Sequence, residues 1–298
     1  MNSEYYTPIE QQHDKHIVIP DLHGESKLLD QVIDKYHDDQ TRFVFLGDII
    51  DQKGIAEEDN NTKNIFESIK ELGNLAIMTM ANHEFVMQGG LFAKKPEIRD
   101  HYSTYWNMIS QNTFEAYDLK PTIRDDHEAM GLLKLAMDDL GHIAVLRSTV
   151  MYFETDKFIA THAGLEPKRD WLEQRDQLDK LAIELGNDKF PDYGGARDLP
   201  TQIFAIENAM GAEKIEGTDK ITLSGHAHYL TPESKRFQRL NIPISGDRVL
   251  HNGTKIRLAS QVNFPSSQDL YIWKDWDEEI DIIPNPSRAI KTNEIETV

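Results

Sequence analysis

Five short polar motifs of this chain each follow an apolar segment, and each carries side chains that bind metals or move protons. They are Pro20-Asp21-Leu22-His23-Gly24, Gly47-Asp48-Ile49-Ile50-Asp51, Ala81-Asn82-His83-Glu84, Thr161-His162-Ala163-Gly164 and Ser224-Gly225-His226-Ala227-His228. Ligands of open α/β sheets bind just beyond the carboxyl ends of the strands. Each motif alone is a weak signal. Five strand ends in one crevice, however, would gather aspartate, asparagine and histidine side chains around a common centre.

The chemistry that this set of side chains supports is metal-assisted hydrolysis. Carboxylates and imidazoles without thiolates favour Mn²⁺, Fe or Zn²⁺ over Ca²⁺ or Mg²⁺ alone. The six or seven ligands exceed the needs of one such ion, so they suit two ions ~3.5–4 Å apart that share one carboxylate. Such a pair clamps the attacking and leaving oxygens of an in-line displacement at phosphorus.

Apolar periodicity places the first three motifs at strand ends. Residues 16–20, 42–47 and 74–80 are short apolar segments that predict buried strands. Residues 26–36 and 64–72 repeat apolar side chains at the spacing of one helix face, with Ser26 as the expected N-cap and Gly73 as the expected C-cap. The resulting β-α-β-α-β order predicts a parallel sheet at the start of the chain.

The rest of the chain changes pattern several times. Residues 85–140 lack strand patterns and predict a helical insert, whereas residues 150–164 predict a β-hairpin. Residues 167–217 predict helix and loop, and β-like segments follow them. We therefore expect a flexible N-terminus, one catalytic domain that contains the insert, and a flexible tail, over residues 1–15, 16–284 and 285–298.

Composition narrows the classes of partner. The 298 residues carry a formal net charge of −19, which disfavours stable binding to nucleic acids or to anionic membranes. The chain contains no cysteine, so disulfides, thiolate metal sites and a cysteine nucleophile are excluded. The N-terminal residues do not form a signal-peptide pattern, and no apolar run approaches the ~20 residues of a membrane span. We expect a cytoplasmic protein.

The five motifs, in this order, resemble those of the calcineurin-like metallophosphoesterases. The family patterns GDxHG, GDxxDRG, GNHE, HAG and GH correspond to them. The PPP branch, which contains Ser/Thr protein phosphatases and diadenosine tetraphosphate hydrolases, is the most similar. The resemblance spans residues 16 to about 230. It implies an α/β fold of four layers, in which a central β-sandwich is flanked by helices and the helical insert lies over the site.

The resemblance also implies a role for each polar residue. Asp21 and His23 would hold the first metal, Asp48 would bridge the two metals, and Asn82, His162 and His226 would hold the second. A hydroxide shared by the metals would attack phosphorus. His83 would protonate the leaving group and would be oriented by Asp51. A carboxylate beside an imidazole raises its pKa and fixes its tautomer. Mn²⁺ is the expected ion, with Fe, Zn²⁺ and Mg²⁺ as alternatives.

Two departures from the family pattern concern phosphate and metal binding. The arginine of GDxxDRG is absent, because Gln52 and Lys53 follow Asp51. Gln52 donates hydrogen bonds without charge, and a lysine lacks the two-pronged geometry of a guanidinium. Arg197 is the expected replacement, so the predicted phosphate contacts are Arg197, Asn82 and Gln52. His228 matches the wider superfamily, where it is a further metal ligand; the alternative is a solvated histidine.

Three functions follow from these residues. The first is a phosphomonoesterase that acts on a phosphoprotein or on a small phosphate ester. The second is a dinucleoside polyphosphate or phosphodiester hydrolase, which a basic channel with aromatic residues beside the metals would favour. The third is a non-catalytic scaffold that binds metal. Loss of a ligand or of His83 would favour the scaffold, and the sequence retains these residues.

Overall fold

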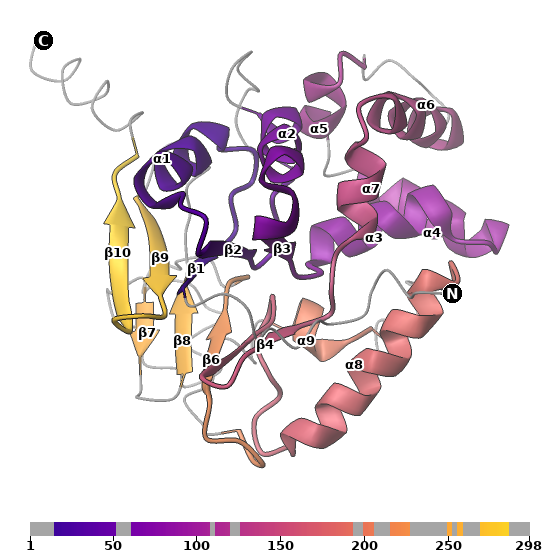
Figure 1. Cartoon of the computed structure of the whole chain (residues 1–298). Helices are drawn as coiled ribbons and strands as arrows, with labels where there is room; N and C mark the ends of the chain where they lie inside the picture. The colour runs from indigo at the N-terminus through magenta and orange to yellow at the C-terminus, as the bar shows by residue number, and fades with distance from the viewer. Residues whose placement is uncertain are drawn as a thin grey trace, which may run out of the picture.

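The computed structural model describes residues 15–51, 61–107, 111–119, 126–192, 199–205, 215–226, 249–251, 255–258 and 269–285. These residues form two five-stranded sheets with helices packed around them (Figure 1). The predicted fold class, a β-sandwich flanked by helices, is confirmed. The predicted flexible ends over residues 1–15 and 285–298 lie almost wholly outside the described residues.

The first sheet has the strand order β10-β9-β1-β2-β3. The strands β1 (Lys15–Ile19), β2 (Thr41–Phe45) and β3 (Ala76–Met78) are parallel, as predicted, and β9 (Leu270–Lys274) and β10 (Glu279–Ile283) complete the sheet in antiparallel pairs. Ile19 pairs with Phe45, and Phe45 pairs with Met78. These last residues are in register, so the first three motifs leave the sheet together at the carboxyl ends of its parallel strands. We call this end of the sheet the motif edge.

The second sheet has the strand order β4-β5-β6-β8-β7. The predicted hairpin is confirmed as the antiparallel pair β4 (Phe153–Glu154) and β5 (Phe158–Ala160). The strand β6 (Ile221–Ser224) runs parallel to β5 and to β8 (Lys255–Leu258), and β7 (Val249–His251) closes the sheet. Ala160 pairs with Leu223, so the last two motifs also leave their sheet side by side.

Side chains on the strands alternate between two apolar layers. Val18, Val44 and Ile77 face the second sheet, where they pack in one cluster with Phe158 and Trp273. Their neighbours along the strands, which are Ile17, Ile19, Phe43, Phe45 and Met78, pack in the other cluster with the helices. This alternation follows from the two-residue period of a strand. Both faces of the first sheet are therefore packed with apolar side chains up to the edge where the motifs begin.

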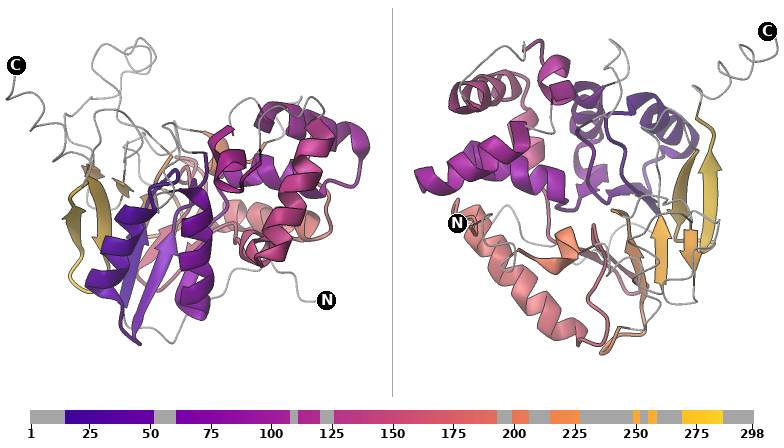
Figure 2. Two further views of the ribbon diagram at one scale, coloured as in Figure 1. Left: turned by 90° about the horizontal axis from the view of Figure 1, so that it is seen from above. Right: turned by 180° about the vertical axis from the view of Figure 1, so that it is seen from behind.

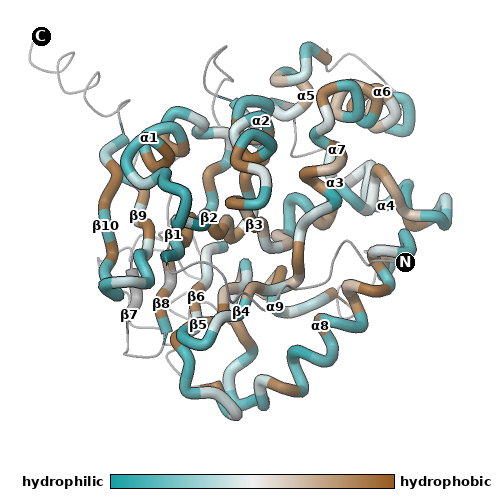
Figure 3. Tube along the Cα trace, in the orientation of Figure 1, coloured by the Kyte–Doolittle hydropathy of each residue, from teal (hydrophilic) through white to brown (hydrophobic). Residues whose placement is uncertain are grey.

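The helices α1 (Ser26–Tyr36) and α2 (Thr62–Leu72) connect the parallel strands. Both bury one apolar face, and Figure 3 shows hydrophobic residues recurring between hydrophilic ones along α1. Gly73 is the predicted C-cap of α2, with φ 57°. The N-cap prediction for α1 is wrong by one residue. Glu25 occupies that position, and the Ser26 side chain is buried inside the first turn.

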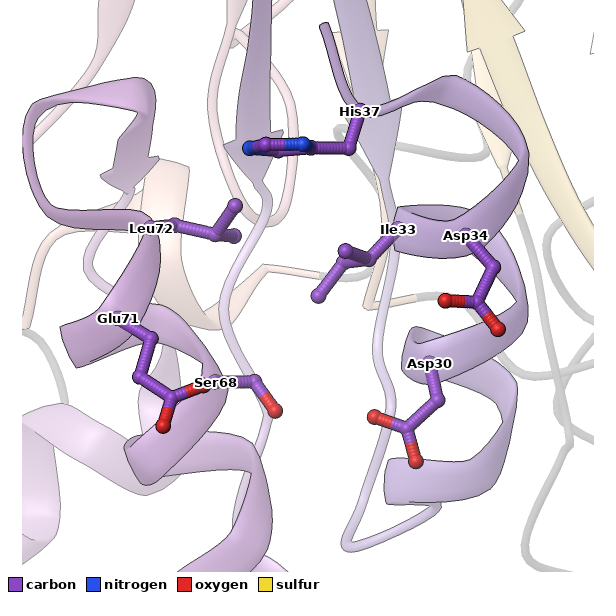
Figure 4. A pocket seen from close by; sticks show the side chains of 7 residues that line it. All are labelled: Asp30, Ile33, Asp34, His37, Ser68, Glu71 and Leu72. Atoms are coloured by element: carbon purple, nitrogen blue, oxygen red, sulfur yellow. The ribbon is translucent and has the colours of Figure 1, made fainter.

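A groove separates α1 and α2 near their C-terminal ends. It is lined by Asp30, Ile33, Asp34, His37, Ser68, Glu71 and Leu72 (Figure 4). These residues belong to the second halves of helices that start at the motif edge and run back along the sheet. The groove therefore lies away from the edge where the five motifs gather.

Among the described residues, helices follow β3 in a series. They are α3 (Asn82–Phe92), α4 (Pro96–Asn107), α5 (Gln111–Ala116), α6 (Asp126–Asp139) and α7 (His142–Arg147). Both views in Figure 2 show them gathered at the side of the sheets opposite β9 and β10. Two more helices, α8 (Trp171–Gly186) and α9 (Thr201–Phe204), lie between β5 and β6 in sequence, and a 3₁₀ turn spans Gly73–Leu75. None of the helices in the described ranges is long and apolar enough to cross a membrane.

Gly47 is required by the close approach of two strand ends, which gives a stability prediction. Its φ is +86°, and a Cβ there would lie 2.4 Å from the Cβ of Ala81. We predict that Gly47→Ala lowers the free energy of unfolding by about 2–4 kcal/mol, because left-handed backbone and overpacking both oppose an alanine. Urea denaturation measures the change.

The matched control for this change is Gly131→Ala on α6. Apart from its chain neighbours and the backbone of its own helix, no atom of the described residues lies within 4 Å of the added methyl group, and the backbone is helical. Alanine in a helix is more favourable than glycine, so this substitution should raise the free energy of unfolding by about 0.5–1 kcal/mol. A similar effect of both substitutions would contradict the steric account of Gly47.

Candidate active site at the strand ends

Backbone hydrogen bonds draw the motif loops together. The N–H groups of Leu22 and His23 donate to the carbonyl of Asp48 over 3.1 and 2.9 Å. In the second sheet, the N–H of Gly225 donates to the carbonyl of His162 over 2.9 Å. The N–H of His226 donates to Oδ1 of Asp21 over 3.1 Å, which joins the two sheets. The loops are thus positioned by one another as well as by their strands.

Four residues of these loops adopt the left-handed backbone conformation. They are His23, Asp48, Asp51 and His226, with φ between 44° and 64°. For residues other than glycine this region costs about 1–3 kcal/mol each, and it persists only where surrounding contacts impose it. Strain concentrated on four polar residues at one sheet edge is typical of a functional site.

Asp48 lies at the centre of the site and is buried. Its Oδ2 lies 3.4 Å from Nε2 of His162, 3.8 Å from Nε2 of His23 and 4.0 Å from Nε2 of His83. Its Oδ1 accepts the N–H of His83 over 3.2 Å. Residues from three different motifs therefore face one carboxylate group.

In each of three histidines, one ring N–H group donates a hydrogen bond to a backbone carbonyl. Nδ1 of His23 donates to Ile50 over 3.0 Å, and Nδ1 of His162 donates to Leu46 over 2.8 Å. Nε2 of His226 donates to Phe204 over 3.2 Å. A carbonyl only accepts, so the opposite nitrogen of a neutral ring carries a lone pair. This arrangement fixes the tautomer of metal-ligating histidines in proteins.

The lone pairs of the second sheet's histidines meet an amide oxygen. Nε2 of His162 lies 2.9 Å from Oδ1 of Asn82 and 2.9 Å from Nδ1 of His226. Three acceptors at such distances need a proton or a cation between them. Burial lowers the pKa of His162, but Asp48, Asp21 and Glu84 together outweigh this effect and raise the pKa to about 9. A divalent cation would take the place of that proton.

The two central carboxylates show the same demand for positive charge. Burial raises the pKa of Asp21 to about 7, with a further increase from Asp48 and a partial decrease from His162. Burial also disfavours ionised Asp48, but His162, His83 and His23 outweigh this effect and hold its pKa well below the usual range. Two buried carboxylates side by side are stable when one of them takes up a proton or when cations lie beside them.

The donor set fits a pair of metal ions. His23, Asp48 and His83 offer ligand atoms within 4.8 Å of one another, and so do Asp48, His162 and His226. Asp48 belongs to both groups, as a bridging carboxylate would. These donors are nitrogen and oxygen atoms without thiolate, a set that suits Mn²⁺, Fe or Zn²⁺, the ions expected from the sequence.

His83 differs from the other histidines because its partner is a carboxylate. Its Nδ1–H donates to Oδ2 of Asp51 over 2.6 Å. Burial lowers the pKa of His83, but Asp48, Asp51 and Glu84 outweigh this effect and raise it to about 10. The side chain of His83 is 15% exposed, whereas those of His23 and His162 are fully buried. Of these three histidines, His83 is therefore the one whose side chain solvent reaches.

Glu84 is a site residue to which the sequence motif gave no role. Its carboxylate accepts the N–H groups of Asp48 and Ile49, each over 2.9 Å. Burial and the neighbouring Asp48 raise its pKa to about 7. Glu84 therefore fixes the backbone that carries Asp48. The signal available in the sequence was its place next to His83, in the motif itself.

The hydroxyl of Thr113 on α5 also reaches the site, where it contacts Asp51. Nothing in the sequence pointed to Thr113, which is 62 residues from Asp51. The structure brings together the predicted residues Asp21, His23, Asp48, Asp51, Asn82, His83, His162 and His226. The predictions for Gln52, Arg197 and His228 fall outside the described residues.

Comparison with known proteins shows the fold. No protein-family model and no curated protein sequence matches the chain. Among solved structures, a protein Ser/Thr phosphatase from Saccharomyces cerevisiae with similarity to human phosphatase PP5 superimposes with a TM-score of 0.52 at 12% identity, over 92% of this chain and 80% of that one. The chain therefore has the fold of that phosphatase, as the five motifs predicted.

Two further solved structures align over most of their length. A diadenosine tetraphosphatase has a TM-score of 0.47 at 14% identity, over 93% of this chain and 96% of that one. A point mutant of a cold-active protein tyrosine phosphatase has a TM-score of 0.47 at 14% identity, over 95% of this chain and 85% of that one.

The shared position of Asp48 predicts how the chain responds to divalent cations. We expect Mn²⁺ to stabilise the fold, by about 2.7 kcal/mol when its concentration is 100 times the Kd. Asp48→Asn removes the charge common to both ligand groups and should abolish this stabilisation. Thermal unfolding with and without Mn²⁺, together with elemental analysis, measures both effects. The exposed Asp39→Asn is the control, and undiminished binding by Asp48→Asn would contradict the assignment.

The contacts of Glu84 predict a separate effect on stability. Glu84→Gln places an amide N–H group against one of the two backbone N–H groups that the carboxylate accepts. An unsatisfied buried donor costs about 1–3 kcal/mol, so urea denaturation should show a loss of this size. The same change should weaken Mn²⁺ binding, since the backbone of Asp48 loses its support. Glu71→Gln on the exposed face of α2 should change neither quantity.

Proposed function

We propose that this chain, which has the fold of a protein Ser/Thr phosphatase, hydrolyses phosphate monoesters with the help of two divalent metal ions. One observation supports the proposal above the others. Asp48 belongs to two groups of side chains that could hold a metal ion, and Nε2 of His83, a member of one of these groups, lies 4.0 Å from its Oδ2. We assign the partly exposed His83 to proton transfer and Asp21 to the metal in its place. A shared carboxylate suits two neighbouring cations, and the histidine suits a leaving group that needs a proton.

The proposed ligands are those that the motifs predicted. Asp21 and His23 would hold one ion, Asn82, His162 and His226 the other, and Asp48 both. Such ions, when bound, neutralise phosphate oxygens and lower the pKa of a coordinated water. The tautomers of His23, His162 and His226 are set in advance by backbone carbonyls, so these rings need no rearrangement to bind.

His83 is the proposed proton donor to the leaving group. Its Nδ1–H is held by Asp51, so Nε2 is the nitrogen that faces the centre of the site. As water attacks phosphorus and the bond from phosphorus to the leaving oxygen breaks, that oxygen takes the Nε2 proton. Asp51 stabilises the imidazolium before transfer and keeps the ring in place afterwards. Positioned acids of this kind contribute about 10²–10⁴-fold to the rate.

The proposed substrate is a phosphoprotein or a small phosphate monoester. The fold shared with a protein Ser/Thr phosphatase supports this class. The net charge of −19 opposes substrates that carry several phosphates, such as dinucleoside polyphosphates. Mn²⁺ is the proposed ion, and Gln52, Arg197 and Asn82 are the proposed phosphate contacts.

The test of the proposal is hydrolysis by the purified chain. With Mn²⁺ we expect release of phosphate from 4-nitrophenyl phosphate and from phosphopeptides, and loss of activity with a chelator. A panel with bis(4-nitrophenyl) phosphate and diadenosine tetraphosphate distinguishes the substrate classes. Preference for either of the last two would overturn the monoester assignment. No hydrolysis of any member, with Mn²⁺, Fe²⁺ or Zn²⁺ bound, would overturn the enzymatic function.

The His83→Ala variant tests the proposed acid. On a phosphoserine peptide, whose leaving group is a poor one, kcat should fall by about 10²–10⁴-fold. The decrease should be much smaller on 4-nitrophenyl phosphate, because nitrophenolate leaves without a proton. Metal content should be unchanged. The exposed His127→Ala is the control, and full activity of His83→Ala on the peptide would contradict the role.

A further inference from the structure

The Thr113 hydroxyl makes two hydrogen bonds to the residue that holds His83. It accepts the N–H of Asp51 over 3.1 Å and donates to Oδ1 of Asp51 over 2.7 Å. The other oxygen, Oδ2, receives the Nδ1–H of His83 over 2.6 Å. Each carboxylate oxygen of Asp51 thus has its own donor. The three side chains form a series in which Thr113 fixes the rotation of the carboxylate and the carboxylate fixes the imidazole.

Asp51 needs such a support because of where it lies. It belongs to no helix or strand, and its backbone has the left-handed conformation with φ 64°. Both Asp51 and Thr113 are buried, so water does not replace the hydroxyl in this position. The side chain of Thr113 supplies the backbone and the carboxylate of Asp51 with one partner that satisfies both.

Thr113 is itself held firmly on α5. The next residue, Phe114, packs its ring 5.1 Å from that of Trp106 on α4. Just beyond α5, the hydroxyl of Tyr117 lies 2.7 Å from Nδ1 of His142 on α7, and Nε2 of His142 lies 2.9 Å from Glu67 on α2. Contacts of residues just after Thr113 therefore tie this part of the chain to α4 and α7, and α7 is tied in turn to α2. A hydroxyl in such a setting has a fixed place rather than a range of rotamers.

We propose that Thr113 is a positioning residue for the proton-donating histidine, an assignment that rests on the proposed function of His83. It touches neither substrate nor metal. By fixing Oδ1 of Asp51, it directs Oδ2 toward His83 and so keeps Nε2 aimed at the leaving group. Its contribution should therefore be to kcat, for leaving groups that need a proton, and not to KM or to metal binding.

The kinetic test compares Thr113→Val with Thr113→Ser. Valine keeps the shape and removes the hydroxyl, whereas serine keeps the hydroxyl and removes a methyl group. On a phosphoserine peptide, kcat of the valine variant should fall about 10-fold or more, as for other buried partners that orient a functional histidine. It should change less than twofold on 4-nitrophenyl phosphate. The serine variant should stay within about twofold of the natural chain on both substrates.

A double variant separates positioning from packing. In the His83→Ala background, Thr113→Val should cause no further loss, because its effect passes through the histidine. An unchanged kcat of Thr113→Val on the peptide would overturn the proposal. So would an equal loss on both substrates, an additive loss in the His83→Ala background, or a serine variant as impaired as the valine variant.

A spectroscopic arm does not depend on turnover. In the Zn²⁺-loaded full chain, the Nδ1 proton of His83 should give a downfield NMR signal that is absent from His83→Ala. The signal should persist in Thr113→Ser and exchange rapidly with water in Thr113→Val. Its undiminished protection in the valine variant would overturn the proposal. If the natural chain hydrolyses no ester, the proposed function fails, and this comparison still decides whether Thr113 positions His83.

Discussion

The site depends on a carboxylate, Asp48, that is ionised in a place where burial opposes charge. The chain compensates with imidazoles from three directions, all within 4.0 Å of its Oδ2. Three imidazoles would be enough to balance the single negative charge of Asp48. Asp21 adds a second carboxylate and Glu84 a third, both with raised pKa values. Protons can neutralise these two carboxyl groups, and bound cations would do so with all three carboxylates ionised.

The architecture around Asp48 serves to hold strained loops still. Two in-register sheets deliver the loops to one edge, and hydrogen bonds between the loops fix their relative positions. Glycine at position 47 allows two strand ends to approach closely, and Glu84 satisfies the backbone of the turn that follows. The apolar clusters on both faces of the first sheet resist any relaxation of that edge. Stability and function thus compete within a few residues of each motif.

Sequence reasoning reached the parts of this structure that repeat with a period or a motif. The continuous apolar segment of β2 and the helical spacing of α2 indicated the parallel sheet, and the order of the five motifs indicated the fold and the gathered side chains. Thr113 was out of reach, because only the tertiary fold brings α5 to Asp51. Ser26 was assigned to the wrong position of α1. Hydrogen bonds of the preceding loop, rather than a capping side chain, decide where that helix begins.

The site is divided between two sheets whose strands are far apart in the sequence. His226 donates its N–H to Asp21 across 205 positions. A chain still emerging from the ribosome with only its first half exposed would own Asp21, His23, Asp48 and Asn82 but neither histidine of the second sheet. If the proposed metal ions bind here, they would bind at full strength only after both sheets have formed and packed together. A partly synthesised chain would then neither bind the ions tightly nor hydrolyse phosphate esters.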